Sequence, residues 1–585
     1  MIFHPSRPLR LADHTADRRM LMLAGLALVI GSGGAAAAWL LLKLIALATN
    51  LAWYGRASFA SVSIVPAAHG PRTLLVPIAG SLVIGLMARF GSDKIRGHGI
   101  PEAIEAILFG QSRLSPKVAV LKPVSAAVSI GSGGPFGAEG PIIMTGGAIG
   151  SLLAQCFHLS AAERKTLLVA GAAAGMTAIF GTPVAAMLLA IEVLLFEWKP
   201  RSFVPVTVAA LAAIAWRPLM IGSGPMFPLV ARMTIDATTL VGAAALGVVV
   251  GVLASSLSSA LYKIEDGFHR LPVHWMWWPA LGALVVGIGG LIDPRVLGAG
   301  YDNIQALLDG SMVVRAIVLL LVIKAMVWLV ALGSGTSGGI LAPLLMLGGA
   351  VGALAGHWLP GGVGLYALAG MAAMMSASMR APLTAAVFAV ELTGRLDALP
   401  VAAAASIAGY AIAVLVLRRS ILTEKIARRG RHLSQEYAVD PLSLVRVGEI
   451  MTRDPDTLLA TMSVADAAVF FGDAPHRSYP VVDGDRRPVG LVSRADALRW
   501  MDSPPDPAAT LGDMVSDASL STVPPTLPVD RVAELMLAKD IGRVPVVDDG
   551  GMLVGLIARR DLLLARTGWH SDERDRMRFT GRKAQ

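Results

Sequence analysis

Long apolar segments alternate with short polar breaks over residues 20–417, whereas residues 418–585 show the mixed pattern of a water-soluble chain. Many apolar segments are shorter than the roughly 20 residues that cross the membrane as one straight helix, and Gly and Pro interrupt them. Irregular backbone is tolerated at membrane depth only where protein or a water-filled cavity surrounds it. The pattern therefore predicts an all-α polytopic membrane domain of short, broken helices, and it favours a transporter or channel over a simple anchor.

Composition and charge agree with this interpretation. Hydrophobic residues make up 55% of the chain and charged residues 16%, which excludes an ordinary soluble protein. Basic residues precede the first apolar segment and follow the last, so both termini are expected to be cytoplasmic. These residues are Arg7, Arg10, Arg18 and Arg19 before it, and Arg418, Arg419, Lys425, Arg428, Arg429 and Arg431 after it. The formal net charge of +9 fits anchoring to membrane lipid and requires no nucleic-acid partner.

A large block of the membrane region recurs about 200 positions later. Matching positions include Lys122 and Lys324, Gly131–Gly133 and Gly333–Gly335, Pro141 and Pro343, Gly97–Gly99 and Gly298–Gly300, and Gly171–Met176 and Gly370–Met375. Because three groups of matches follow one another in register, the sequence predicts two structural repeats, approximately residues 72–222 and 276–417.

Glu139 breaks the symmetry of the repeat, since Leu341 stands opposite it. The glutamate precedes an apolar helix that we expect to start at Ile142-Ile143. A helix N-terminus carries roughly half a positive charge and free N–H groups, so it attracts anions. A glutamate there can fill an anion site itself and leave it when an anion competes or when it is protonated. An ordinary first-turn acid is the alternative, but an ionisable group at membrane depth favours a function.

Three Gly-rich segments carry a resemblance to a known family. Gly97–Pro101, Gly137–Pro141 and Gly339–Pro343 resemble, in order and spacing, the motifs of the CLC chloride channel and transporter family over about residues 20–430. The resemblance implies two repeats inverted in the membrane, a homodimer with one chloride pore in each subunit, and a multi-pass location in a bacterial inner membrane. It implies a transport protein and not an enzyme. It makes Glu139 the gating glutamate and places the anion-binding groups at His98, Gly99, Ile100, Gly140, Ile340 and Leu341.

The chain departs from the family pattern at several ligand positions. His98 replaces a serine, and it either donates an N–H to the anion or turns aside. Leu341 replaces a phenylalanine, and Leu422 lies where the family has a tyrosine whose hydroxyl meets the anion. Lys122 falls at a position where family members often carry lysine. It either raises the local positive potential or has a structural role.

Proton coupling depends on a second acid in the family's exchangers. Glu192 matches the first of two adjacent glutamates, but Val193 stands at the proton-relay position. Valine there resembles the passive channels of the family, so we expect a passive, pH-gated or voltage-gated pore. Glu197, one helical turn away, is a substitute relay in the alternative of a proton–chloride antiporter. Glu192 and Glu391 are equivalent in the two repeats and are expected to be structural.

The soluble region contains a second duplication. Pro480–Asp483 recurs 65 residues later as Pro545–Asp548, and the Gly490-Leu491-Val492 segment recurs in the same register. This resembles a tandem pair of α/β CBS domains, at 447–501 and 511–566. A cytoplasmic segment (1–19), a basic helix and linker (418–446) and a tail (567–585) complete the predicted organisation.

In the CBS family an adenine nucleotide binds between the repeats, with its ribose held by an Asp that follows a Ser or Thr by three residues. Ser493 and Asp496 fit this spacing, whereas Ala558 before Asp561 lacks the hydroxyl. A nucleotide site and a purely dimerising role both remain open, and no other cofactor or metal is expected.

Two other classes of protein fit the sequence less well. A divalent-cation transporter with CBS domains needs several carboxylates converging at membrane depth, and this chain has few acids there. An intramembrane hydrolase is disfavoured because the chain has no H-E-x-x-H motif and no His/Asp partner set.

Overall fold

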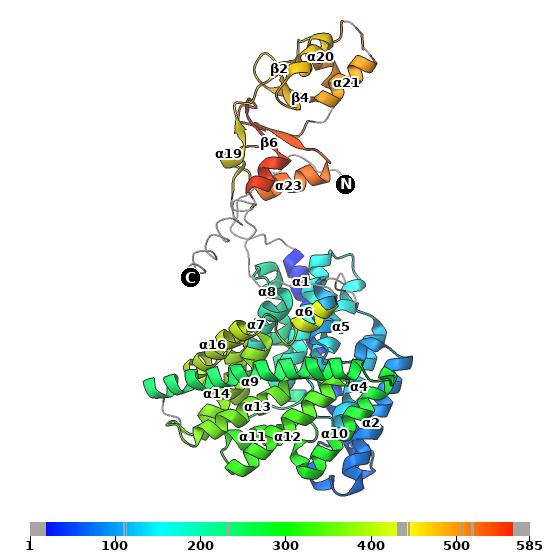
Figure 1. Cartoon of the computed structure of the whole chain (residues 1–585), viewed down its shortest axis with the longest axis vertical. Coiled ribbons are helices and arrows are strands. Elements are labelled where there is room, and N and C mark those ends of the chain that lie inside the picture. The colour runs from blue at the N-terminus through cyan, green and yellow to red at the C-terminus, as the bar shows by residue number, and fades with distance from the viewer. Residues whose placement is uncertain are drawn as a thin grey trace. The chain divides into compact units, whose positions relative to one another are not determined.

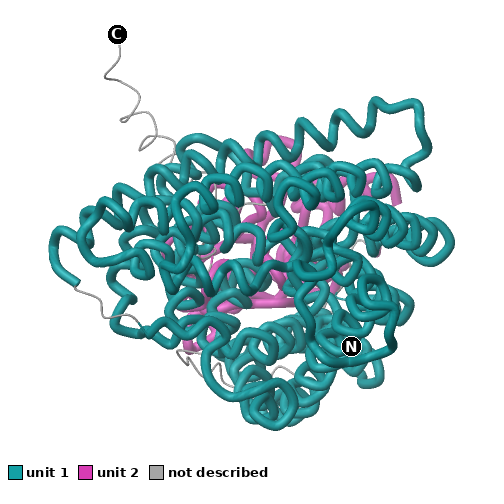
Figure 2. Tube along the Cα trace, turned by 90° about the horizontal axis from the view of Figure 1, so that it is seen from below, with its two compact units in different colours: residues 1–435 teal, residues 436–585 magenta. Residues whose placement is uncertain are grey.

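The computed structural model describes residues 19–108, 112, 114–230, 235–429, 442, 445–503, 505–506, 508–515 and 520–565. Within them the chain forms a helical unit inside residues 1–435 and a smaller α/β unit inside residues 436–585 (Figures 1 and 2). The predicted segment 1–19 apart from Arg19, residues 430–441 and 443–444 of the predicted linker, which include Arg431, and the tail 567–585 lie outside the described residues.

The helical unit is built from long and short helices. They are α1 (Arg19–Thr49), α2 (Pro71–Phe90), α3 (Ile100–Leu108), α4 (Pro116–Gly131), α5 (Glu139–Gln155), α6 (Ala161–Phe180), α7 (Pro183–Leu189), α8 (Pro200–Met220), α9 (Ala237–His269), α10 (Trp278–Ile292), α11 (Tyr301–Leu308), α12 (Val314–Gly333), α13 (Leu341–Gly356), α14 (Val363–Met379), α15 (Pro382–Thr393), α16 (Leu399–Val416) and α17 (Thr423–Arg428). Short π or 3₁₀ segments are η1 (Asn50–Tyr54), η2 (Val65–Ala67), η3 (Asp93–Ile95), η4 (Ala190–Leu195), η5 (Trp275–Trp277), η6 (Pro294–Val296) and η7 (Leu396–Ala398).

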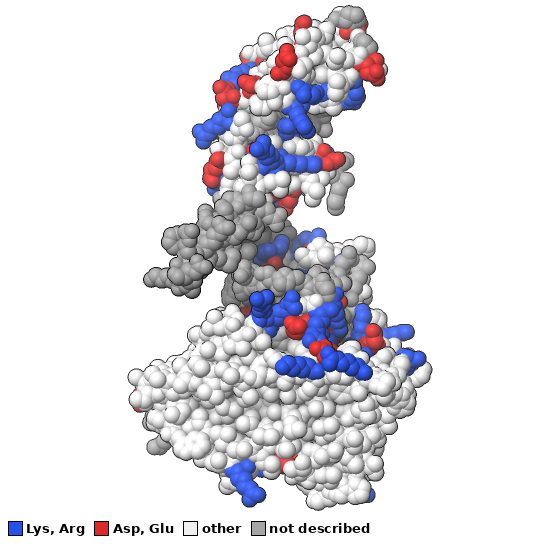
Figure 3. All heavy atoms as spheres, viewed as in Figure 1, with Lys and Arg blue, Asp and Glu red and all other residues white. Residues whose placement is uncertain are grey.

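Local sequence explains many helix starts. Pro occupies the first turn of α2, α7, α8 and α15, where its missing N–H costs nothing. Ser160 and Glu163 form a capping box at the start of α6. Among the described helices, seven helical spans are long and apolar enough to cross a membrane, and shorter apolar helices such as α13, α14 and α15 accompany them. The helical unit also shows a broad zone without charged side chains on the face seen in Figure 3. The expectation of a polytopic domain with short helices is confirmed.

The order of elements from α1 to α8 recurs from α9 to α16. The outer helices belong to the repeats as well, because α1 packs against α6 and α8 as α9 packs against α14 and α16. Gly31 of α1 lies against the Ala209 carbonyl of α8, and Gly247 of α9 lies against the Ala405 carbonyl of α16. Each repeat is thus one helix longer than the sequence similarity indicated. Such contacts require only a small residue at a single position. They therefore produce no repeated motif by which the sequence of α1 could be matched to that of α9.

The inner helices of each repeat approach at backbone distance. A methyl group at Gly146 or Gly171 would collide with the carbonyl of the other, and Gly348 and Gly370 stand in the same relation. These pairs join α5 to α6 and α13 to α14. Small residues allow this close approach, which is a common mode of packing in membranes.

Each repeat also provides a carboxylate that caps the N-terminus of a helix in the other repeat. The Glu391 carboxylate accepts the N–H groups of Val184 and Ala185, at 3.1 and 2.8 Å, in the first turn of α7. Reciprocally, the Glu192 carboxylate accepts the N–H of Leu383 at 3.3 Å and that of Thr384 at 2.8 Å, at the start of α15. A carboxylate at a helix N-terminus satisfies free N–H groups and the helix dipole. Both acids therefore hold the repeats together.

The α/β unit contains two three-stranded sheets, with strand orders β2-β3-β4 and β1-β6-β5. Its elements are α19 (Val447–Ile450), β1 (Thr452–Arg453), β2 (Leu458–Leu459), α20 (Val464–Asp473), β3 (Ser478–Val482), β4 (Pro488–Ser493), α21 (Arg494–Asp502), α22 (Leu511–Val515), α23 (Val529–Ala538), β5 (Arg543–Val547) and β6 (Leu553–Ala558). Strand β1, from the first sequence repeat, pairs antiparallel with β6 of the second.

The sequence repeats of this unit are not its packing units. Val447, which opens the first repeat, is buried with Val523 and Val544 of the second. Leu511 and Val515, which open the second repeat, are buried with the first. The predicted spans 447–501 and 511–566 therefore exchange their opening segments, because each opening segment supplies apolar side chains that the other core requires.

Candidate anion-transport site

The N-termini of α5 and α13 meet through the loops that precede them. The N–H of Gly137 donates to the Gly339 carbonyl at 3.1 Å, and the N–H of Gly339 donates to the Gly137 carbonyl at 2.9 Å. This antiparallel bridge joins equivalent loops, as a two-fold relation between the repeats requires. It brings two helix N-termini, and their free N–H groups, to one place. Gly140 and Leu341 lie in the first turns of these helices, and Ile340 immediately precedes α13.

Glu139 is the first residue of α5, three residues earlier than the helix start expected from the sequence. Its side chain is 1% exposed and lies against Gly137 and Gly339. Neither carboxylate oxygen makes a well-formed hydrogen bond within the described part of the chain, although the Ala342 N–H and the Tyr301 hydroxyl face it. Burial of a carboxylate without a cationic partner costs several kcal/mol. Movement of this side chain out of the site, or its protonation, would remove that cost.

The Gly97–Gly99 loop adds a third helix N-terminus, since α3 begins at Ile100. The His98 carbonyl presses so closely on Gly140 that any side chain there would collide with it. His98 itself is 3% exposed, and its Nδ1 has no partner among the described residues. His98 is one of the residues that line the cavity beside this loop. The N–H of Gly99, in contrast, donates to Glu102 Oε2 at 3.1 Å.

Lys122 and Lys324 have the same environment in the two repeats. Lys122 Nζ donates to the carbonyls of Ile95 and Gly97 at 2.8 and 2.7 Å. Lys324 Nζ donates to those of Val296 and Gly298 at 2.9 and 2.8 Å. Both side chains are fully buried. Each lysine thus holds a Gly-rich loop against the helix that carries the lysine.

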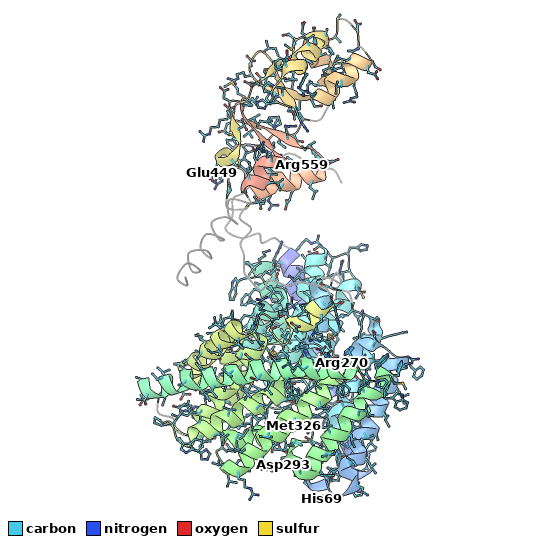
Figure 4. All side chains as sticks on the ribbon, in the orientation of Figure 1. His69, Arg270, Asp293, Met326, Glu449 and Arg559 are labelled. Carbon is cyan, nitrogen blue, oxygen red and sulfur yellow. The ribbon has the colours of Figure 1, made fainter. Side chains whose placement is uncertain are left out.

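Two cavities approach these loops. One, of about 980 Å³, is lined by Gly97, His98 and Met144 together with charged residues of α9 and α17. The other, of about 650 Å³, is lined by Ala138, Gly298–Tyr301 and the loop 61–65. Figure 4 shows His69 and Asp293 toward one end of the helical unit, with Arg270 farther from that end. Along the chain, Glu139 directly follows Ala138, which lines the second cavity, and precedes Met144, which lines the first.

Tyr301 is a site residue that the sequence did not reveal. It begins α11, and its hydroxyl lies 3.5 Å from the Ala138 N–H and faces the Glu139 carboxylate. Tyr301 aligns with Ile100 in the repeat, so a polar residue directly after the second Gly-x-Gly was the available signal. Leu422, where the family has a tyrosine, is fully buried and offers no hydroxyl.

The positions that a proton relay would occupy are apolar or already hydrogen-bonded. Val193 is 1% exposed. Glu192 caps α15, as described above. Glu197 accepts from Ser202 Oγ at 2.8 Å and pairs with Lys199 Nζ at 3.0 Å.

The candidate nucleotide residues act as helix caps in this structure. Asp496 Oδ2 accepts from the N–H and hydroxyl of Ser493, at 2.9 and 2.6 Å, and its other oxygen pairs with Arg499. Asp561 accepts the Ala558 N–H at 2.8 Å.

Two repeats that bring several helix N-termini to one buried carboxylate define a membrane protein for the transport of small anions. Residues 79–414 match the family model described as voltage gated chloride channel, and residues 447–503 and 512–568 match the CBS domain model. The chain belongs to the CLC family of voltage-gated chloride channels and carries a CBS pair, which confirms the resemblance found in the sequence.

Known relatives agree. The voltage-gated ClC-type chloride channel ClcB of Escherichia coli O81 (strain ED1a) is 30% identical over 370 residues, which cover 61% of this chain and 88% of the relative. A slow cyanobacterial Cl⁻/H⁺ antiporter has a similar fold, with a TM-score of 0.62 and 23% identity over 71% of this chain and 99% of that one. A eukaryotic CLC transporter has a TM-score of 0.59 and 19% identity, and the match covers 93% of this chain and 98% of that one.

Proposed function

We propose that the protein carries chloride across a bacterial inner membrane, with both termini cytoplasmic, through a separate pathway in each subunit of a homodimer, and that Glu139 gates each pathway. The observation that carries the proposal is the Glu139 carboxylate, which is buried where α5 and α13 begin and has no cationic partner among the described residues. Helix N-termini that accept a carboxylate also accept chloride. The relatives named as chloride channels support the choice of anion.

In this proposal Glu139 and chloride compete for one binding site, where α5 and α13 begin. The ionised carboxylate fills this site and blocks passage between the two cavities. Protonation, or a chloride ion arriving at high concentration, releases the side chain and opens the pathway. The His98 ring and the N–H groups at Gly140, Ile340 and Leu341 then face the passing anion, while Lys122 and Lys324 keep the local potential positive.

We further propose that conduction is passive. The apolar Val193 at the relay position and the use of Glu192 as a helix cap support this choice. Proton-coupled exchange, the activity named for the cyanobacterial structure, is the alternative, and Glu197 is then the candidate relay.

Reconstitution in liposomes tests both the passive character of conduction and the role of Glu139 as the gate. A chloride gradient is imposed, and chloride and external pH are recorded together. Chloride flux without proton movement is expected; chloride flux that drives protons uphill would establish the antiporter. Glu139→Gln mimics the protonated gate, so its flux should be high and should no longer depend on pH. Asp309→Asn, at an exposed acid after α11, is the control and should keep the wild-type pH profile. An unchanged pH profile in Glu139→Gln would remove Glu139 from the gate.

A further inference from the structure

Three helices begin at the same surface of the membrane. Arg19 Nε, at the start of α1, lies 2.9 Å from Glu163 Oε1 in the first turn of α6. The Thr166 hydroxyl of α6 lies 3.5 Å from Ser202 Oγ in the first turn of α8. Both α1 and α8 are long and apolar enough to cross a membrane. The beginnings of α1, α6 and α8 therefore lie together at one membrane surface, which the basic N-terminal segment predicts to be the cytoplasmic one.

Three bases lie near one another at this surface. They are Lys165 of α6, Lys199 directly before α8 and Arg201 in the first turn of α8. The charges of Lys199 and Arg201 are close enough to oppose that of Lys165, and Glu197 is the acid close enough to favour it. Glu197 pairs with Lys199 Nζ at 3.0 Å, and Lys165 Nζ donates to the Leu195 carbonyl at 2.9 Å. Arg201 is exposed, and it has no ion pair or hydrogen bond within the described part of the chain.

An exposed tryptophan accompanies these bases. Trp198 directly precedes Lys199 and is 64% exposed. Its ring stacks on that of Phe203 in α8, with 5.4 Å between the ring centroids and 17° between the planes. The stacking holds the indole at the start of α8 while most of its surface stays uncovered. Tryptophan at the end of a membrane span lies at the level of the lipid headgroups, so a lipid molecule is the natural neighbour of this ring.

We propose that Trp198, Lys199 and Arg201 bind one anionic phospholipid of the surrounding membrane. The lipid phosphate lies between the Arg201 guanidinium and the Lys199 ammonium, and the Trp198 ring lies along the glycerol and the upper acyl chain. A guanidinium donates two parallel hydrogen bonds to phosphate, and the exposed pair of Lys199 with Glu197 is weak enough to be exchanged for it. None of these residues lines either of the two cavities described above, so the lipid site is separate from the anion pathway and does not rest on the proposed function.

The cluster has a simpler interpretation, in which its bases only add to the positive charge of a cytoplasmic membrane surface and attract anionic lipids without holding any one of them. The two interpretations differ in whether the position of a base matters. Diffuse attraction depends on the number of charges, so any two exposed bases at this surface are equivalent. A binding site depends on Lys199 and Arg201 in particular, and also on Trp198, which carries no charge.

The test is native mass spectrometry of the purified full-length protein in detergent. The protein is titrated with palmitoyl-oleoyl phosphatidylglycerol and, separately, with phosphatidylcholine of the same acyl chains. Loss of hydrogen bonds to a charged group changes affinity by roughly tenfold, so the double variant Lys199→Gln, Arg201→Gln should bind phosphatidylglycerol roughly tenfold more weakly than wild type. Trp198→Ala should weaken the binding of both lipids, because the ring contacts the part that they share.

A second double variant, Lys263→Gln, Arg270→Gln, is the matched control. It removes two exposed bases at the end of α9. Asp266 of the same helix end pairs with Arg428 of α17, so these bases belong to the surface that is also predicted to be cytoplasmic. The control loses the same number of charges and should bind phosphatidylglycerol as wild type does.

Weaker binding in the first double variant with unchanged binding in the control supports the lipid site. Equal losses in the two double variants, no loss in either, or unchanged lipid binding in Trp198→Ala overturn it. Inorganic phosphate is added in a third arm at the molar concentration of the lipid. If it displaces phosphatidylglycerol from the wild-type protein, the site takes free phosphate and the proposed lipid site is wrong. If the first double variant does not fold, Arg201→Gln alone decides: weaker binding of phosphatidylglycerol supports the site, and unchanged binding refutes it.

Discussion

Replacing Lys122 with methionine is expected to destabilise the helical unit by about 2–4 kcal/mol. The ammonium is fully buried and donates to two carbonyls, at 2.8 and 2.7 Å. Methionine fills most of the space of the lysine stem but leaves both carbonyls unpaired, at about 1–3 kcal/mol each. Release of the buried charge offsets part of this loss. Lys324→Met should lose a similar amount, because that side chain makes the same two bonds in the other repeat.

The free energy of unfolding is measured by titrating SDS into mixed micelles that contain each purified variant. Lys165→Met is the matched control, because this half-buried lysine donates to one carbonyl, that of Leu195, at 2.9 Å. The control should lose less than about 1 kcal/mol. If Lys122→Met stays within about 0.5 kcal/mol of wild type, the predicted cost of the two unpaired carbonyls is refuted. If it differs from Lys324→Met by more than about 2 kcal/mol, the equivalence of the two lysines is refuted.

Three further outcomes are expected. Glu391→Gln and Glu192→Gln should each lower stability by about 1–2 kcal/mol in the same SDS titration, because a neutral amide caps a helix less well than a carboxylate; no loss in either would show that the caps are dispensable. Tyr301→Phe removes the hydroxyl that faces the ionised gate, so chloride flux in liposomes should begin at a higher pH than in wild type, and an unchanged profile would exclude the hydroxyl. Val447→Asp should increase hydrogen exchange in β5 rather than β3, although Val447 belongs to the first sequence repeat; faster exchange in β3 alone would contradict the exchanged packing.

The parts of the fold that depend on a visible pattern in the sequence were predictable. Interrupted apolar segments and the recurrence of Lys122 at Lys324 led directly to two repeats of broken helices. The membership of α1 and α9 in the repeats was not predictable, because their packing depends on single small residues such as Gly31 and Gly247. The exchanged CBS segments were hidden for a related reason: a buried valine such as Val447 fits either core equally well.

Some residues of the candidate site were likewise predictable from the sequence, and others were not. Glu139 and the Gly-rich loops stand out in the sequence because an acid at membrane depth and a repeated glycine pattern are both rare. Glu102 and Lys425, whose side chains pair at 2.9 Å beside Gly97, carry no such signal, since 323 positions separate them (102 to 425) and only the docking of α17 on α3 brings them together. Tyr301 likewise gains its importance from the meeting of the α5 and α11 N-termini.

The exchange of opening segments between the CBS repeats has a consequence for synthesis on the ribosome. When residue 501 leaves the exit tunnel, the first repeat is complete in sequence, yet its core still lacks Leu511 and Val515. Val447 and β1 meanwhile have no partner until β6 emerges, about a hundred residues after them. The first core can therefore close only after residue 515 has emerged, beyond the end of its own repeat, whereas the core that contains Val447 must wait for β5 and β6. A nonsense codon between the repeats would leave two incomplete cores instead of one intact CBS domain.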